Sequence, residues 1–201
     1  MNQTGLLFII SSPSGGGKDS VINALIKMFP DSTRVITTTT RAPRPGNING
    51  VDYHFITPEE FKQKLATGDF VEHNVYGGNY YGMQKKHLAE LLATHPIVFT
   101  QIDVNGKHQL DDAHLRHVSI FLIPDNLETL RQRILARGGL TPKAIEERMK
   151  IAAEEITAAA DYEYKIINKN GKMPETVAKI AEIIEKRTNQ RRSIDNKGEI
   201  G

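Results

Sequence analysis

The sequence contains no cysteine and no long apolar run. Without a thiol, neither a disulfide framework nor a thiolate metal site can form, so we expect a protein of a reducing compartment, with the cytoplasm as the default location. The apolar stretch near the N-terminus covers only residues 5–10, far fewer than the roughly 20 residues that a membrane-spanning helix needs. We therefore expect no membrane insertion and no membrane partner.

An excess of charge of one sign is also missing. The chain has 26 Lys and Arg against 24 Asp and Glu, a formal net charge of +2, while 39% of its 201 residues are hydrophobic and 25% are charged. This composition is typical of a soluble globular protein, and we expect neither a disordered chain nor a nucleic-acid partner. The length predicts one compact domain with small insertions, and it leaves open whether the protein is a monomer or a homo-oligomer.

Short apolar runs alternate with segments of helical periodicity. The runs predict strands buried on both faces of a parallel sheet, over residues 5–11, 96–103, 117–123 and 162–168. The periodic segments predict helices over residues 20–29, 126–138, 141–160 and 173–187. This alternation predicts an α/β fold, with a parallel sheet core covered by helices on both sides. Residues 187–201 are polar and lack an apolar period, so we expect a frayed or disordered polar tail.

The stretch SPSGGGKD, residues 12–19, lies directly between the first predicted strand and the first predicted helix. A phosphate-binding loop has the pattern G-x-x-x-x-G-K-S/T: its backbone N–H groups converge on phosphate oxygens, its lysine reaches the β- and γ-phosphates, and its hydroxyl binds magnesium. Lys18 and three consecutive glycines match this pattern, while Ser12 replaces the first glycine and Asp19 replaces the hydroxyl residue. The order strand, loop and helix predicts a binding site for nucleotide phosphates.

Four further motifs follow: TTTTRAPRPG at 37–46, VDYHF at 51–55, FVEHNVYGGNYYG at 70–82 and QIDVNG at 101–106. Together with the loop and three later arginines, they resemble the guanylate kinase family over about residues 5–186. The resemblance implies a P-loop kinase fold in which residues 1–186 form one domain. Its parts would be a core (1–35, 89–125 and 159–186), an insertion that binds the nucleoside monophosphate (36–88) and a helical lid (126–158). It also implies transfer of the γ-phosphoryl group of ATP to GMP or dGMP, with Mg²⁺ bound together with ATP.

The resemblance assigns the phosphate of the acceptor nucleotide to Arg41, Arg44, Tyr53 and Tyr81, and it counts Arg41 among the catalytic residues. The two arginines are separated by one small residue and a proline, which restricts the backbone and can aim two guanidinium groups at one dianionic phosphate. Because this phosphate is already anionic, catalysis needs alignment and charge neutralisation rather than a strong general base. We therefore expect no catalytic histidine.

The guanine base would contact Glu72, Asp103 and Thr37, again by resemblance. The two oxygens of a carboxylate such as that of Glu72 can accept hydrogen bonds from the N1–H and the N2 amino group of guanine, a pair of donors that adenine lacks. Met83 stands where the family usually has a serine or threonine. One hydroxyl contact to the base is therefore lost.

The resemblance assigns ATP to the loop and to one residue near the end of the chain, and it assigns catalysis to Lys18 and to lid arginines. The ATP-binding residues are Ser14, Gly15, Gly16, Gly17, Lys18, Asp19, Ser20 and Asn168. The lid arginines are Arg133, Arg137 and Arg148, of which the first two are four residues apart and so share one helix face. Closure of the lid could bring them to the transferring phosphoryl group.

Two departures from the family concern the metal. The family's D-I-D element begins with an acid that acts at the magnesium site, but Gln101 occupies that position here, while the loop has gained Asp19. We predict that Asp19 takes over the negative charge on the metal side, directly or through water. The alternative is that Asp19 only stabilises the N-terminus of the helix that it begins.

Two other functions remain open. The G-K-D-S ending of the loop also resembles ribose 1,5-bisphosphate phosphokinase, whose acceptor is a phosphorylated sugar, although Tyr53, Glu72 and Tyr81 favour a nucleotide acceptor. Alternatively, the chain could be a non-catalytic guanylate kinase-like binding module. The retention of Lys18 and of the loop glycines favours an enzyme.

Overall fold

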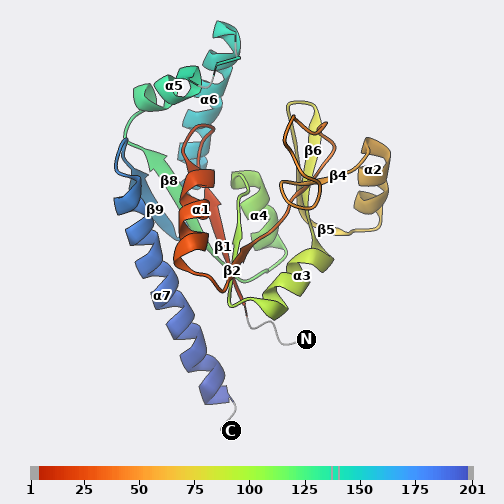
Figure 1. Cartoon of the computed structure of the whole chain (residues 1–201), viewed down its shortest axis with the longest axis vertical. Coiled ribbons are helices and arrows are strands. Elements are labelled where there is room, and N and C mark those ends of the chain that lie inside the picture. The colour runs from red at the N-terminus through yellow and green to blue at the C-terminus, as the bar shows by residue number, and fades with distance from the viewer. Residues whose placement is uncertain (1–4, 137, 140, 199–201) are drawn as a thin grey trace.

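The predicted strands form one parallel sheet at the centre of the molecule (Figure 1). The computed structural model describes residues 5–136, 138–139 and 141–198. Its strand order is β2-β7-β1-β8-β9, and every neighbouring pair is parallel. The strands are β1 (Leu6–Ser11), β2 (Ser32–Arg34), β7 (Ile97–Thr100), β8 (His117–Pro124) and β9 (Tyr164–Asn168). All were predicted except β2, a short edge strand.

Both faces of this sheet are covered by helices, which confirms the predicted α/β class. Leu6, Phe8 and Ile10 of β1 pack with residues of α1 (Lys18–Met28) and α7 (Met173–Gly198). The alternate residues Leu7 and Ile9 pack with residues of α3 (Lys85–Thr94) and α4 (Val104–Asp112) on the opposite face. Successive side chains of a strand point to opposite faces, so the buried strand β1 is apolar at every position from Leu6 to Ile10.

A smaller sheet stands beside the parallel one, on the right in Figure 1. Its strand order is β4-β3-β6-β5, with β3 (Thr38–Thr39), β4 (His54–Phe55), β5 (Phe70–Tyr76) and β6 (Asn79–Gln84). Helix α2 (Pro58–Ala66) begins at a capping box made by Thr57 and Glu60, and its Phe61 stacks on Phe70 of β5 at a ring-centroid distance of 4.3 Å. The short extended pieces predicted between 36 and 88 are therefore one sheet, covered by a helix that the sequence reading did not predict.

A β-bulge in β5 decides which side chains of this sheet face the parallel sheet. The pairing with β6 shifts between Phe70 and Glu72. Phe70 packs towards α2, while Glu72, two residues later, lies on the other face and pairs with Met83 across the sheet. Without the extra residue, the period of two would place both side chains on the same face.

Two helices cross the top of the molecule in Figure 1. They are α5 (Leu127–Ala136) and α6 (Pro142–Ala158), followed by the short 3₁₀ helix η1 (Ala159–Asp161). Leu130, Ile134, Ile145 and Ala152 form a buried cluster between them. The predicted site residue Arg137 lies outside the described residues.

The C-terminal helix corrects one expectation. Helix α7 continues to Gly198, so the prediction of a frayed or disordered tail is wrong for residues 187–198. Two polar contacts hold this segment to the domain: Arg187 pairs with Glu163, and Arg191 donates a hydrogen bond to the carbonyl oxygen of Gly5 at 2.8 Å. Residues 187–197 also contain no glycine or proline that would break a helix. The absence of an apolar period from residues 187–197 therefore does not end helix α7.

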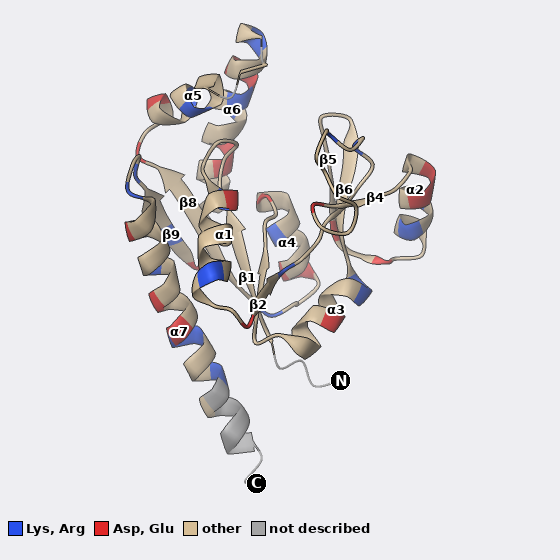
Figure 2. Cartoon of the chain, in the orientation of Figure 1, with Lys and Arg blue, Asp and Glu red and all other residues tan. Residues whose placement is uncertain are grey.

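Charges are mixed over the surface of the fold. Basic and acidic residues are interspersed along the helices (Figure 2), in keeping with the balanced composition. Within the described ranges, no helix is both long enough and apolar enough to cross a membrane.

Candidate active site

The glycine-rich loop joins the end of β1 to the start of α1 and has the geometry of a phosphate-binding loop. Gly17 caps α1 with a φ of 90°, a left-handed conformation that favours glycine, and no side chain caps the first N–H groups of the helix. A Cβ atom on Gly16 would lie 2.5 Å from the Ser12 hydroxyl oxygen, so a side chain there would clash. The Gly16 N–H donates a hydrogen bond to the Pro13 carbonyl oxygen at 2.8 Å, and the N–H groups at the start of α1 are available to an anion.

Asn168, at the end of β9, is hydrogen-bonded to this loop. Its side-chain amide donates a hydrogen bond to the Gly16 carbonyl oxygen at 2.8 Å, and its oxygen accepts one from the Thr176 hydroxyl at 3.0 Å. The Asn168 side chain is buried. The structure thus gives this residue a role in holding the loop, next to the ATP contact that was predicted for it.

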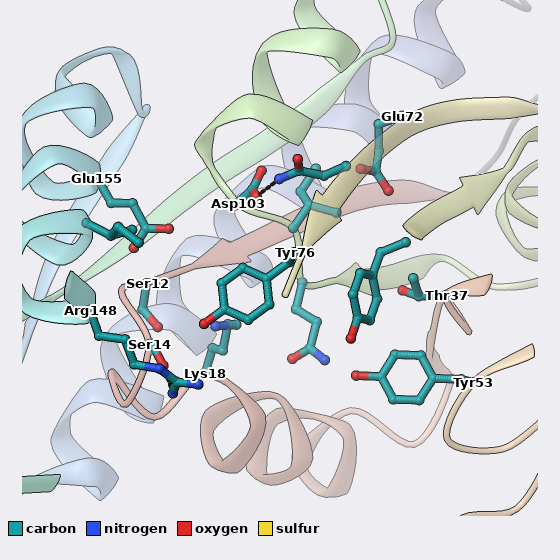
Figure 3. A pocket seen from close by; sticks show the side chains of 15 residues that line it. Ser12, Ser14, Lys18, Thr37, Tyr53, Glu72, Tyr76, Asp103, Arg148 and Glu155 are labelled. Atoms are coloured by element: carbon teal, nitrogen blue, oxygen red, sulfur yellow. Dashed lines mark hydrogen bonds between the residues drawn. The ribbon is translucent and has the colours of Figure 1, made fainter. Parts of the chain in front are cut away.

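A cavity of about 250 Å³ opens between the loop, the small sheet and α6 (Figure 3). It brings together eight of the predicted site residues, namely Ser14, Lys18, Thr37, Tyr53, Glu72, Tyr81, Asp103 and Arg148. Five others that line it were not named from the sequence, namely Asn74, Tyr76, Ile102, Ile151 and Glu155, while Ser12 was named there only as part of the loop pattern. Residues predicted for the donor and for the acceptor nucleotide therefore share one cavity.

Glu72, predicted to contact the base, lines the cavity and is only 4% exposed. Burial, and to a lesser extent the negative charge of Asp103, raises the pKa of the Glu72 carboxyl to about 8, while a hydrogen bond from the Met83 backbone acts in the opposite direction. The Met83 side chain is fully buried among Leu88, Leu92 and other apolar residues. The side chain at position 83 is thus part of the core.

Asp103 is fixed in two ways. One carboxylate oxygen caps α4 by accepting a hydrogen bond from the Gly106 backbone N–H at 2.8 Å, and the other accepts a short hydrogen bond from the side-chain amide of Asn74 (Figure 3). Asn74 is itself held by a hydrogen bond from the Val75 backbone N–H to its side-chain oxygen at 2.7 Å. Both carboxylate oxygens of Asp103 therefore have fixed hydrogen-bond partners.

The residues predicted for the acceptor phosphate gather at the wall formed by the small sheet. Tyr53 and Tyr81 meet edge to face, with ring centroids 6.1 Å apart, and burial, followed by the neighbouring Tyr81, raises the pKa of the Tyr53 hydroxyl. The Arg41 guanidinium lies 5.4 Å from the Tyr53 ring centre and donates a hydrogen bond to the Asn47 side chain at 3.1 Å. The exposed Arg44 binds the same Asn47 oxygen through its backbone N–H at 3.0 Å. Asn47 thus links the two arginines next to the cavity.

Arg133 and Arg148, the two described arginines that were predicted for the lid, contact different segments of the chain. Arg148 of α6 donates a hydrogen bond to the Ser14 hydroxyl of the loop at 3.2 Å. Arg133 of α5 reaches the Asn168 carbonyl oxygen and the Asn170 side-chain oxygen, both at 3.4 Å. Arg148 therefore lies at the phosphate loop itself, and Arg133 lies at the segment behind it.

Asp19, the residue predicted for the metal, does not line the cavity, whereas Gln101 does. Asp19 is exposed, and its carboxylate forms an ion pair with Arg34 at 3.0 Å. Ser20 is exposed as well. Gln101 lines the cavity, and its buried side-chain oxygen has no hydrogen-bond partner among the described residues.

Glu155 is a further carboxylate in the cavity. Burial raises its pKa to about 7, the positive charge of Lys18 acts in the opposite direction, and the negative charge of Asp103 adds to the rise. Among the described residues, no three or more His, Cys, Asp or Glu side chains lie together so that they could hold a metal ion. Mg²⁺ needs no such cage beside a nucleotide, because it keeps several waters and binds phosphate oxygens with one or two carboxylates.

Comparison with known proteins identifies the family. The guanylate kinase family model matches residues 5–187. A guanylate kinase of Clostridium perfringens strain SM101 is 39% identical over 91% of this chain and 84% of its own length. A guanylate kinase of Idiomarina loihiensis is 42% identical over 82% of this chain and 79% of its own length.

Solved structures agree with these relatives. The crystal structure of guanylate kinase from Anaplasma phagocytophilum superposes with a TM-score of 0.73 at 31% identity, covering 92% of this chain and 86% of that one. A shikimate kinase from Acinetobacter baumannii, 13% identical with a TM-score of 0.50, shares the fold alone. The sequence resemblance is confirmed by these matches over nearly the whole chain, and the protein belongs to the guanylate kinase family.

Proposed function

We propose that this protein transfers the γ-phosphoryl group of ATP to the phosphate of GMP or dGMP, releasing ADP and the nucleoside diphosphate. One observation carries the proposal: a single cavity joins a phosphate-binding loop, with Lys18 and Ser14, to two acids, the buried Glu72 and the half-buried Asp103. ATP bound at the loop and the guanine base bound at Glu72 and Asp103 would place the γ-phosphoryl group and the acceptor phosphate between these two ends of the cavity.

Base recognition would fall to Glu72. As a carboxylate, it accepts hydrogen bonds from the N1–H and the N2 amino group of guanine, and adenine offers no such pair. In the nucleotide-free cavity the charged form is disfavoured by burial and by Asp103. Two hydrogen bonds from guanine would replace those to water that the Glu72 carboxylate loses on burial. Binding of the acceptor would therefore favour the ionised state of Glu72.

The acceptor phosphate would bind between the tyrosines and the arginines of the small sheet. Tyr53 and Tyr81 line the cavity, and Arg41 and Arg44 are held beside it by Asn47. These residues would orient the phosphate so that one of its oxygens attacks the γ-phosphorus of ATP in line. Since that oxygen is already anionic, no residue of the chain needs to remove a proton from it.

Charge neutralisation at the transferring group would come from the loop and the lid. Lys18 and Arg148 line the cavity from these two sides, and Arg133, together with the predicted Arg137, would join them as the lid closes. Fixed cations in a site without bulk water stabilise the charge of the transition state more effectively than water does. Closure would also keep water from accepting the phosphoryl group.

Magnesium bound with ATP would neutralise the β- and γ-phosphates. Asp19, Ser20 and Gln101 supply oxygen donors around the loop, the ligand type that Mg²⁺ prefers, and this donor set fits the ion. Asp19 remains the acid proposed for it.

The proposal is tested by coupled ADP release with ATP and Mg²⁺. The acceptors would be GMP, dGMP, AMP, UMP and ribose 1,5-bisphosphate, each assayed with wild type and with Glu72→Gln. We expect turnover with GMP and dGMP above all others, and a loss of that preference in the variant. Preference for the sugar bisphosphate would replace the proposed acceptor, and absence of turnover with all five would indicate a binding module.

A further inference from the structure

We infer that His87 positions Thr37 for the acceptor nucleotide, by binding the backbone where the chain passes from the parallel sheet into the small sheet. His87 does not itself line the cavity, so it would act only through the residues that it holds. The inference rests on the proposed use of GMP, and it assigns to His87 the role of a positioning residue.

The chain enters the small sheet and leaves it through two segments that lie side by side. Residues 35–37 lead from the parallel sheet to β3, and α3 leads from the end of β6 back to the parallel sheet (Figure 1). Val35 and Leu88 are buried in one apolar cluster, together with residues of β1 and β7. Ile36 and His87 are the neighbouring residues on the side of the small sheet. Both segments are therefore anchored in the core directly beside these two residues.

A hydrogen bond joins the two segments at this point. The Ile36 backbone N–H donates to Nε2 of His87 at 3.3 Å. The residues on either side bind one sheet each: the Val35 N–H donates to a carbonyl oxygen of β7 at 2.8 Å, and the Thr37 carbonyl oxygen accepts from the His54 N–H of β4 at 2.9 Å. His87 thus satisfies a backbone donor at the step between the two sheets.

Thr37 is the cavity residue whose place depends on this bond. It lines the cavity, and it directly follows Ile36 in the chain, so the backbone torsion angles of Ile36 set the position of the Thr37 hydroxyl. On the other side of Thr37, the Thr38 hydroxyl accepts a hydrogen bond from the Gln84 side-chain amide at 2.7 Å. Gln84 is the N-cap residue of α3. The start of this helix therefore holds Thr37 from both sides.

His87 can hold Ile36 only as a neutral imidazole, because Nε2 has to accept the hydrogen bond. Burial lowers the pKa of His87 below its ordinary 6.5, and His54 of β4, whose ring meets that of His87 edge to face at 5.5 Å, acts in the same direction. Glu90 of α3 acts in the opposite direction. The bond is therefore intact at neutral pH and is lost as the pH falls through the lowered pKa.

The test compares two substitutions of His87 in steady-state assays with ATP, Mg²⁺ and GMP at neutral pH. His87→Gln can still offer an uncharged acceptor to Ile36, whereas His87→Leu cannot. We expect His87→Leu to raise the KM for GMP about fivefold at a constant KM for ATP, and His87→Gln to stay within about twofold of wild type. His95→Gln, at the C-cap of the same helix, is the matched control and should follow wild type.

A double substitution shows whether His87 acts through Thr37. In a Thr37→Val background, His87→Leu should raise the KM for GMP by less than about twofold, because the hydroxyl that His87 positions is already gone. A full rise of about fivefold on top of Thr37→Val would contradict the inference. So would equal rises in His87→Leu and His87→Gln, which would point to the packing of the ring instead of its hydrogen bond.

NMR spectroscopy provides an arm that needs no turnover and no His87→Leu protein. When wild type is titrated with acid, the Ile36 amide resonance should shift with the midpoint of the His87 ring, and His87→Gln should lack this shift. An Ile36 amide that does not follow His87 would overturn the inference, as would an unchanged KM for GMP in His87→Leu. Wild type without any turnover of GMP would instead refute the proposed function, and with it this role of His87, so the two failures are distinguishable.

Discussion

Replacing Glu72 with glutamine should change both the stability and the acceptor affinity of the protein as functions of pH. Glu72 is buried, and its pKa rises from an ordinary 4.5 to about 8. Between these values the folded protein holds the proton and the unfolded chain has lost it. The free energy of unfolding of wild type should therefore fall as the pH rises from 4.5 through about 8.

The size of the effect follows from the same values. Each pH unit between 4.5 and about 8 corresponds to about 1.4 kcal/mol, so ionising Glu72 costs the nucleotide-free fold at most about 5 kcal/mol. Glu72→Gln keeps the shape and removes this titration. Urea denaturation at pH 5, 7 and 9 should show the variant becoming more stable relative to wild type with each step.

The affinity of wild type for GMP should rise with pH, whereas its stability falls. Because guanine requires the ionised carboxylate, wild type should gain about tenfold in GMP affinity between pH 6 and pH 7, relative to the variant. The GMP phosphate titrates in the same way in both measurements, so its contribution cancels when the affinity of wild type is divided by that of the variant. Glu182→Gln, at an exposed position of α7, is the control and should follow wild type. The same pH dependence in Glu72→Gln and wild type would refute the reasoning.

Three further substitutions test separate parts of the site. Asn168→Ala removes the hydrogen bond to Gly16, so we expect a loss of about 1–3 kcal/mol in the free energy of unfolding and weaker ATP binding by calorimetry; unchanged ATP affinity would show that the loop needs no such support. Asn74→Ala frees one oxygen of Asp103, and the KM for GMP should rise roughly fivefold while the KM for ATP stays constant; equal changes in both would contradict a role at the base. Arg148→Ala should lower kcat about 10²-fold in steady-state assays, as loss of a transition-state donor does, and an unchanged kcat would place the arginine outside the reaction.

The phosphate loop and the parallel sheet were predictable because their signals are local. The strand, the three glycines and Lys18 are contiguous, and a strand buried on both faces needs an unbroken apolar run. The edge strand β2 was missed because three residues carry too little pattern. The C-terminal helix was predicted too short, because its last turns are held by polar contacts from Arg187 and Arg191 rather than by an apolar stripe.

The cavity residues that were missed had weaker but usable signals. Asn74 and Tyr76 follow Glu72 at the period of a strand, so all three belong to one face, and all three line the cavity. Glu155 follows Arg148 by seven residues, two helical turns. Neither pattern could show that these faces meet across the loop, because that depends on how the small sheet and α6 pack on the core.

The most direct test of the function is to identify the products formed from ATP, Mg²⁺ and GMP by chromatography as the reaction proceeds. Phosphoryl transfer to the nucleotide predicts that ADP and GDP appear in equal amounts, and that replacing GMP with AMP abolishes both. ADP formed without GDP would mean that water or another acceptor takes the phosphoryl group, and it would contradict the function proposed for this cavity.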